Sequence, residues 1–323
     1  MPSPRRTLRR SILVPAASAT RLSARGFHKK SDAAQQLLET VGRSFRAGYV
    51  YAVEARSPLE AEESLEKVPE QFRGFAYEGA AMGLAILDGL PLPGDWRIVR
   101  FLAGRADRYV YMTYVGVGWA MARLPRFRWS KLTAPDPLLR WLVLDGYGFH
   151  QAYFRTRQYV TKHYQQPRLP WPGGRHAWYA TRAVDQGIGR ALWYVAGTDP
   201  HLVSELIDDF PATRRSDLYS GVGLAATYAG GADETELGTL RERAGRWRPN
   251  LAQGSAFAAR AQVRAGLVPP HTETATRVFC GMSTEGAARV TDEAVPERAA
   301  PNLPSYERWR QSIAESFATA YHR

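Results

Sequence analysis

The sequence predicts a mainly α protein built from stacked helix pairs, either an α-solenoid or the same array closed into an α/α toroid, with an irregular C-terminal segment. Apolar residues recur with helical periodicity along most of the chain, and the alternation typical of strands is scarce. A short glycine motif also returns at a spacing in the thirties, as in helical-repeat proteins. With 323 residues, 45% of them hydrophobic, the chain has apolar material for one large core or two modest ones.

The first expected helix begins at Ser57-Pro58, where a serine N-cap precedes a proline at the first helical position, and it extends to about Phe72. Prolines and glycines predict loops at 89–94 and 166–174. The segment 269–303 carries several prolines without strong periodicity, so we expect it to be irregular. The other expected helices are 75–87, 96–102, 107–124, 137–164, 177–196, 200–209, 215–229, 233–246, 250–265 and 304–320.

This pattern divides the chain into three parts. Residues 1–31 form a basic arm that we expect to be flexible, residues 32–268 form the helical-repeat domain, and residues 269–323 add the irregular segment and a last helix on the same body. The arm holds eight of the lysines and arginines and no acid, so the rest of the chain accounts for only about +4 of the net charge of +12. No basic stripe interleaved with aromatic residues follows, and we expect no nucleic-acid partner.

The cysteine content and hydropathy favour a cytoplasmic protein. The single cysteine, Cys280, excludes an intramolecular disulfide and a cysteine-based metal site, and it fits a reducing compartment. No stretch has the 18 or so uninterrupted apolar residues of a membrane-spanning helix, so none is expected.

The repeated motif is a glycine, any residue, a small residue, usually a large one, and another small one. Successive leading glycines are 37, 30, 41, 34 and 33 residues apart. Glycine within a helix costs about 1 kcal/mol relative to alanine, so the motif needs a compensating gain. Close approach of helix backbones is the favoured explanation, and an anion site at helix N-termini is the alternative. The six copies begin at Gly79, Gly116, Gly146, Gly187, Gly221 and Gly254.

His150 breaks the pattern of this motif. It stands four residues after Gly146, where the other copies have glycine or alanine. A large titratable side chain at a close-packing position predicts a gap or pocket beside it. His150 is then either a buried structural histidine, bonded to a carbonyl or to Asp145, or a proton-transferring or ligand-binding group.

Carboxylates supply the other catalytic candidates. The residue before the leading glycine is polar in five of the six copies, and side chains in this register would line one end of a cavity or groove. Asp145 and Glu78 are the best acid or base candidates and Asp185 follows, while helix capping or an ion pair with Arg182 or Arg190 is the structural alternative. The six residues are Glu78, Val115, Asp145, Gln186, Ser220 and Gln253.

The central copies are rich in aromatic residues. Aromatic side chains at helical spacing form a core or line a pocket for a flat, conjugated apolar substrate or a developing carbocation. Gly146-Tyr147-Gly148 and Gly187-Ile188-Gly189 lack a dinucleotide fingerprint, and no phosphate loop, zinc helix or nucleophile elbow is present, so we expect no cofactor and no metal. The candidate substrate-binding residues are Tyr147, Phe149, Tyr153, Arg190 and Trp193.

Four ordered blocks resemble the bacterial domain-of-unknown-function family 1702, over about residues 26–268. This family includes a small protein of the enediyne polyketide cassette, and the resemblance implies a place in actinobacterial natural-product biosynthesis. It assigns no catalytic residues. The blocks are 73–81, 144–150, 185–193 and 221–231.

Three functions remain open on this basis. The first is an enzyme that reshapes or cyclises a polyene-derived apolar substrate without a bound redox cofactor. The second is a helical-repeat scaffold that docks the polyketide synthase or partner enzymes. The third is an isoprenoid cyclase, which the gene neighbourhood would separate from the first.

Overall fold

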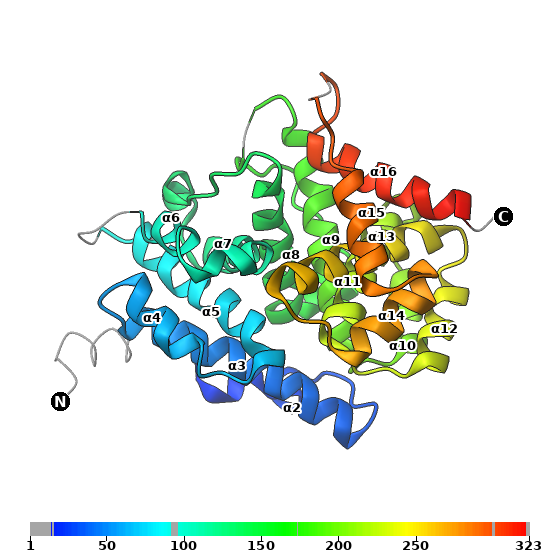
Figure 1. Cartoon of the computed structure of the whole chain (residues 1–323), viewed down its shortest axis with the longest axis horizontal. Helices are drawn as coiled ribbons and strands as arrows, with labels where there is room; N and C mark the ends of the chain where they lie inside the picture. The colour runs from blue at the N-terminus through cyan, green and yellow to red at the C-terminus, as the bar shows by residue number, and fades with distance from the viewer. Residues whose placement is uncertain (1–13, 15, 92–95, 173, 299–300, 321–323) are drawn as a thin grey trace. The chain divides into compact units, whose positions relative to one another are not determined.

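The computed structural model describes residues 14, 16–91, 96–172, 174–298 and 301–320, and the regular structure in those ranges is helical, without strands. The mainly α prediction is thereby confirmed (Figure 1). Two compact units are present: residues 1–26 and 36–147 make the first, and residues 27–35 and 148–323 make the second. The boundary falls inside helix α8 (Leu142–Phe154), which therefore contributes residues to both units.

The first unit begins its helices where local capping allows. Ser57 accepts a hydrogen bond from the Glu60 N–H and caps α4, as expected, but α4 ends at Leu65 because Pro69 lacks an N–H and stands at the start of α5. A long helix, α3, precedes α4 and was not expected. The elements are η1 (Ala17–Thr20), α2 (Leu22–Arg25), most of α3 (Asp32–Glu54), α4 (Pro58–Leu65), α5 (Glu70–Gly89), α6 (Arg97–Leu102), η2 (Arg105–Tyr109), α7 (Val110–Arg123), η3 (Arg126–Lys131), η4 (Leu139–Trp141) and the first half of α8.

The second unit is an array of helix pairs. Helices α9, α11, α13 and α15 pack in succession, α10, α12 and α14 form a second layer, and α16 packs on α13 and α15. Asp199 caps α10, and Asp233 forms a capping box at the start of α12. After the second half of α8, the elements are η5 (Arg157–Thr161), η6 (Ala177–Tyr179), α9 (Ala180–Val195), α10 (Pro200–Asp208), α11 (Ala212–Ala229), α12 (Glu234–Arg243), η7 (Gly245–Trp247), α13 (Arg248–Ala265), α14 (Pro270–Cys280), α15 (Thr284–Glu293) and α16 (Ser305–Ala320).

The prediction of an irregular segment at 269–303 was wrong over most of its length. Two short helices, α14 and α15, occupy it. Pro270 lies in the first turn of α14, where a missing N–H costs nothing, and the Ser283 hydroxyl caps α15. The prolines mark helix starts here rather than a lack of helix.

The expectation of a flexible N-terminal arm fails for residues 27–30. Phe27 is buried, and the His28 N–H donates to the Val195 carbonyl at 3.0 Å. The Lys30 ammonium pairs with Glu236 at 2.7 Å, so this part of the arm is fixed to the second unit. Residues 1–13 and 15, which carry half of the arm's cations, lie outside the described residues.

The leading glycines bring helix backbones together. A Cβ added to any of five of them would overlap the carbonyl oxygen of a residue on the preceding helix of the series. For the copies after the first, this carbonyl belongs to the residue that directly precedes the leading glycine of the preceding copy. The pairs are Gly79 with Phe45, Gly116 with Glu78, Gly146 with Val115, Gly221 with Gln186 and Gly254 with Ser220.

Four of the six copies have a second glycine two residues after the first, and it makes the matching contact in the other direction. A Cβ there would overlap the carbonyl oxygen of the residue three positions before the next leading glycine. We call the two resulting series the glycine rows: α3, α5, α7 and α8 in the first unit, and α8, α9, α11 and α13 in the second. The pairs are Gly118 with Val143, Gly148 with Val184, Gly189 with Leu218 and Gly223 with Leu251.

Helix α3 is an additional member of the first row. A Cβ on Gly48 would overlap the carbonyl oxygen of Ala76, which lies three positions before the leading Gly79, so Gly48 corresponds to the second glycine of a motif. Phe45, whose carbonyl oxygen faces Gly79, corresponds to the residue before a leading glycine. Arg46 occupies the leading position itself, so the motif is not visible in the sequence of α3.

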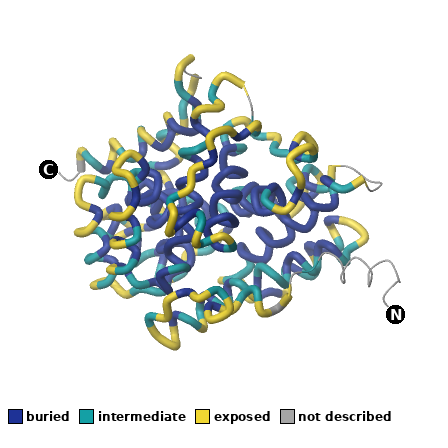
Figure 2. The backbone as a smooth tube through the Cα atoms, turned by 180° about the vertical axis from the view of Figure 1, so that it is seen from behind, coloured by how far each residue is buried: buried dark blue, intermediate teal, exposed yellow. Residues whose placement is uncertain are grey.

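These contacts confirm close packing as the reason for the glycines. Each of these glycines lies within a helix, where no free N–H groups exist for an anion. A Cα hydrogen facing a carbonyl oxygen contributes about 0.5–1 kcal/mol, which offsets the cost of glycine in a helix. The motif-bearing helices are mostly buried, and buried residues are dark blue on the tube in Figure 2. Among the described helices, none is long and apolar enough to cross a membrane.

Replacing a row glycine should therefore destabilise the protein. We expect Gly221→Ala to lower the free energy of unfolding by at least about 1–3 kcal/mol, because its Cβ would overlap the Gln186 carbonyl. Gly238→Ala in α12 is the control: nothing lies within 4 Å of its Cβ position, and alanine should stabilise the helix by up to about 1 kcal/mol. Urea unfolding of both variants measures this. Equal stabilisation by the two substitutions would contradict close packing at Gly221.

Candidate functional site

His150 lies on α8 and belongs to the second unit. Its side chain is buried, with 8% of the residue exposed. The imidazole ring is tilted by 38° against the ring of Phe154, and their centroids are 4.7 Å apart. A titratable ring thus lies against an aromatic face within the unit.

Aromatic rings surround this part of α8. Phe149 stacks on Tyr153 at 5.8 Å, and the edge of Tyr194 from α9 meets Phe149 at 5.2 Å. Phe27 approaches Tyr153 edge-on at 4.9 Å. Such edge and offset contacts add about 0.5–1.5 kcal/mol each to the burial of apolar area. We call this group the α8 aromatic cluster: Phe27, Phe149, Tyr153, Phe154 and Tyr194.

The two α9 candidates differ in what they contact. The Arg190 guanidinium lies 5.2 Å from the centre of the Phe149 ring, at the edge of the α8 aromatic cluster, and Arg190 is 6% exposed. Trp193 is fully buried, and its indole N–H donates to the Gly230 carbonyl at 2.9 Å. Arg190 is therefore placed beside the cluster, whereas Trp193 ties α9 to the end of α11.

Three other predicted site residues lie in the first unit. Glu78, Asp145 and Tyr147 are all buried. The Tyr147 ring meets Trp129 edge-on at 5.7 Å. The predicted site residues are thus divided between the two units, with His150 and Asp185 in the second.

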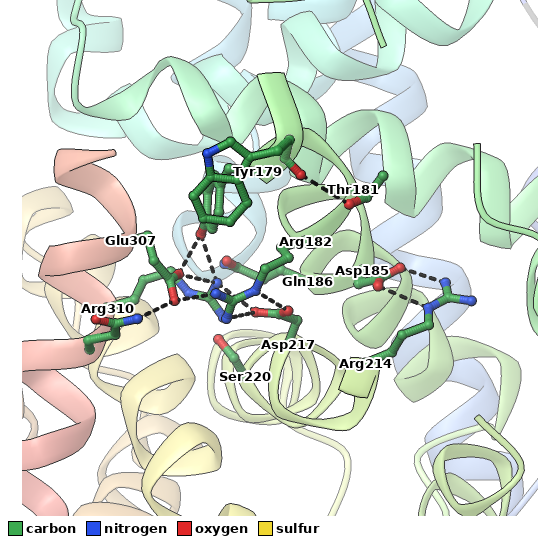
Figure 3. A network of polar contacts seen from close by, with 12 residues as sticks. Tyr179, Thr181, Arg182, Asp185, Gln186, Arg214, Asp217, Ser220, Glu307 and Arg310 are labelled. Atoms are coloured by element: carbon green, nitrogen blue, oxygen red, sulfur yellow. Dashed lines mark hydrogen bonds and ion pairs between the residues drawn. The ribbon is translucent and has the colours of Figure 1, made fainter. Parts of the chain in front are cut away.

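A buried ionic group that the sequence did not predict joins α16 to α9 and α11 (Figure 3). We call it the α16 ion cluster. Asp217, Glu307 and Arg310 are each 4% exposed or less, and Tyr179 is fully buried. Its members are Tyr179, Arg182, Asp217, Glu307 and Arg310.

Both arginines of the cluster bridge both carboxylates. Arg310 Nη1 donates to Asp217 Oδ1 at 2.8 Å and to Glu307 Oε2 at 3.1 Å. Arg182 Nε donates to Asp217 Oδ2 at 2.9 Å, and its Nη1 lies 2.7 Å from Glu307 Oε1. The Tyr179 hydroxyl donates to Glu307 Oε2 at 2.8 Å. Two positive and two negative charges therefore balance in a closed hydrogen-bonded group.

Burial raises the pKa of Tyr179 well above its ordinary value, so the phenol stays protonated and remains a donor. Each charge in the cluster has opposite charges within ion-pair distance. A group with its charges and donors satisfied in this way holds α16 in place. It is therefore better suited to structure than to catalysis.

Asp185 forms a neighbouring ion pair rather than an open acid or base. Arg214 Nε and Nη2 donate to its two oxygens at 2.9 and 2.5 Å, and Arg214 Nη1 donates to the His163 carbonyl at 2.7 Å. The structural alternative of an ion pair holds for Asp185, but its partner is Arg214 instead of Arg182 or Arg190. Burial raises the pKa of Asp185 to about 6, against the lowering effect of Arg214.

Three of the polar residues that precede leading glycines gather beside the cluster. Ser220 Oγ donates to Gln253 Oε1 at 2.6 Å, and Arg310 Nε donates to the same oxygen at 3.3 Å. The Tyr306 hydroxyl donates to Gln186 Oε1 at 3.2 Å. The shared register places these side chains beside one another, where α16 covers them.

Sequence reasoning missed the residues that α16 and α11 contribute. Arg214 and Asp217 lie three residues apart in the polar start of α11, and Glu307 and Arg310 lie three residues apart on one face of α16. The spacing of these charges could have indicated buried ion pairs. Within the described part of the chain, no three His, Cys, Asp or Glu side chains form a group able to hold a metal ion.

A family profile described as protein of unknown function (DUF1702) matches residues 5–317. The chain belongs to the DUF1702 family. No curated protein and no solved structure matches it. In this DUF1702 protein, the four sequence blocks fall on α5, α8, α9 and α11, all of which belong to the glycine rows.

Removing one partner of the α16 ion cluster should cost much stability. We expect Arg310→Met to lower the free energy of unfolding by about 3–5 kcal/mol, because it leaves Asp217 and Glu307 buried with one cation fewer. Arg308→Met, an exposed position of the same helix, is the control and should change it by less than about 0.5 kcal/mol. Urea unfolding compares them, and similar small effects in both variants would show that the cluster does not hold α16.

Proposed function

We propose that this DUF1702 protein is an accessory enzyme of bacterial natural-product biosynthesis, of the enediyne polyketide type. In this proposal it reshapes or cyclises a polyene-derived apolar substrate without a bound redox cofactor. The observation that carries the proposal is the α8 aromatic cluster, whose Phe154 ring contacts His150, at the one motif copy with a large titratable residue in place of a small one. The sequence resemblance supplies the biosynthetic context.

His150 is the proposed proton-transferring residue. A neutral imidazole has one ring N–H and one ring nitrogen with a free lone pair, so it can both donate and accept a proton. A proton added to or removed from a conjugated chain shifts its double bonds and permits ring closure. General acid or base catalysis of this kind contributes about 10²–10⁴ in rate.

The aromatic side chains suit both the substrate and its charge. Flat rings such as Phe149 and Tyr153 pack against a conjugated chain, and their faces stabilise a developing positive charge. Arg190 beside Phe149 places a fixed cation at the edge of the cluster, where an anionic end of a substrate would bind. The same cluster would serve an isoprenoid cyclase, and the genes beside this one distinguish the two substrates.

A scaffold that docks the polyketide synthase or partner enzymes is the second candidate. It is favoured by the stacked helix pairs of the second unit, since such arrays commonly bind proteins. A scaffold would co-purify with its partners and would tolerate substitution of His150.

Gene deletion followed by complementation tests the proposal. We expect deletion to abolish the final product and to leave an upstream polyene. His150→Ala and His150→Gln should each reduce product formation by about 100-fold or more at an unchanged melting temperature. The exposed His201→Ala is the control and should restore full production.

A normal titre in the deletion strain would contradict a biosynthetic role. Full complementation by both His150 variants would remove His150 from the mechanism and favour the scaffold. A large fall in the melting temperature of His150→Ala would instead identify a core histidine, because the substitution leaves a void and strands a hydrogen-bond partner.

A further inference from the structure

A short basic segment follows α7 in the first unit. Arg123 ends α7, and the 3₁₀ turn η3 carries the other members. We call this segment the basic turn. No acidic residue occurs between Arg123 and Asp136 in the sequence. The members of the basic turn are Arg123, Arg126, Phe127, Arg128 and Lys131.

A buried tryptophan fixes the basic turn to the body of the unit. Trp129 is 6% exposed, and its indole N–H donates to the carbonyls of Met121 at 3.0 Å and Leu124 at 3.2 Å. The Arg128 N–H donates to the Pro125 carbonyl at 2.8 Å. The turn is therefore held in one conformation, which lowers the entropy lost when it binds a partner.

Phe127 points away from this anchor. It is 78% exposed, the largest exposure of any large hydrophobic side chain in the described residues. The Arg128 guanidinium lies 5.6 Å from the centre of its ring. A benzyl group held on a fixed turn and flanked by arginine has the composition of a binding hot spot, in which aromatic residues and arginine are enriched.

The four cations of the basic turn have no acidic partner among the residues that the structure describes. None of them makes an ion pair with another residue in the described ranges. Arg123, Arg126 and Lys131 are exposed. Elsewhere in the same unit, Arg73 and Arg97 pair with Glu66 and Asp88. The turn is thus a small surface with unbalanced positive charge around one apolar side chain.

We propose that the basic turn is a docking surface for an acidic protein surface, in which an apolar patch receives Phe127 and carboxylates pair with the surrounding cations. This inference goes beyond the proposed catalytic function and does not depend on it. Charge complementarity would speed association, and burial of the Phe127 ring would supply most of the affinity.

Two other classes of partner fit the basic turn less well. Specific DNA-binding proteins commonly contact 6–10 phosphates, more than four cations on one short turn can reach. A membrane-binding segment needs a broad apolar face, and one phenylalanine among four charges does not provide it. An acidic protein surface matches both the single apolar anchor and the small number of charges.

The test uses the full-length protein and a synthetic amphipathic helical peptide with glutamates along one face and leucines along the other. We expect saturable binding that weakens with added salt. Phe127→Ala should weaken it by about tenfold or more, and the double substitution Arg126→Glu with Arg128→Glu should abolish it. Fluorescence anisotropy of the labelled peptide measures the affinity.

Matched controls separate this surface from general charge and hydrophobicity. Leu59→Ala removes a side chain that is 62% exposed but lies beside Glu60 in acidic α4, and it should leave binding unchanged. Arg289→Glu with Arg308→Glu changes the net charge by the same amount at exposed positions of the second unit, and should have at most a small effect.

Three outcomes would overturn the proposal. The first is no binding of the peptide, and the second is binding that Phe127→Ala does not weaken. The third is tighter binding to duplex DNA or to anionic phosphatidylserine vesicles than to the peptide. Substrate conversion by Phe127→Ala, measured with free substrate, should equal that of the wild type, so this test fails or succeeds independently of the catalytic proposal.

Discussion

The close approach of helix backbones is the constraint on which this fold depends. The glycines that make these contacts lie where a Cβ would overlap a carbonyl oxygen of a neighbouring helix, so the distance between neighbouring helices is fixed by main-chain atoms. Main-chain atoms are the same in every repeat, and the register therefore passes from one helix to the next without depending on particular side chains. Helix α3 follows the same register through Gly48 alone.

This register determines which polar side chains meet. Gln186, Ser220 and Gln253 each precede a leading glycine, so they stand at equivalent heights on three neighbouring helices. Helix α16 covers them and adds Glu307 and Arg310, and its buried charges are balanced by Arg182 and Asp217. Buried ion groups of this kind contribute little net stability but tolerate no missing partner, so they specify how α16 must dock.

One motif copy departs from the residue pattern of the others. Helix α8 carries both glycines of the motif and then His150, and it is the helix in which one compact unit ends and the other begins. The aromatic cluster beside His150 draws on α8, α9 and the segment before α3. The basic turn belongs to the first unit and uses none of these residues, so the proposed catalytic and docking residues lie in separate parts of the chain.

The sequence by itself determined the helical class, the glycine register and the replacement of a small motif residue by His150, because these are local patterns of residue type and spacing. Only the tertiary structure decided the rest. Asp185 pairs with Arg214, 29 residues away, and Asp217 with Arg310, 93 residues away, and no local pattern encodes such partners. The helices of 269–303 and the membership of α3 were missed because prolines at helix starts resemble breaks and Arg46 hides the motif. Packing against neighbours, which local spacing does not record, settled each of these points.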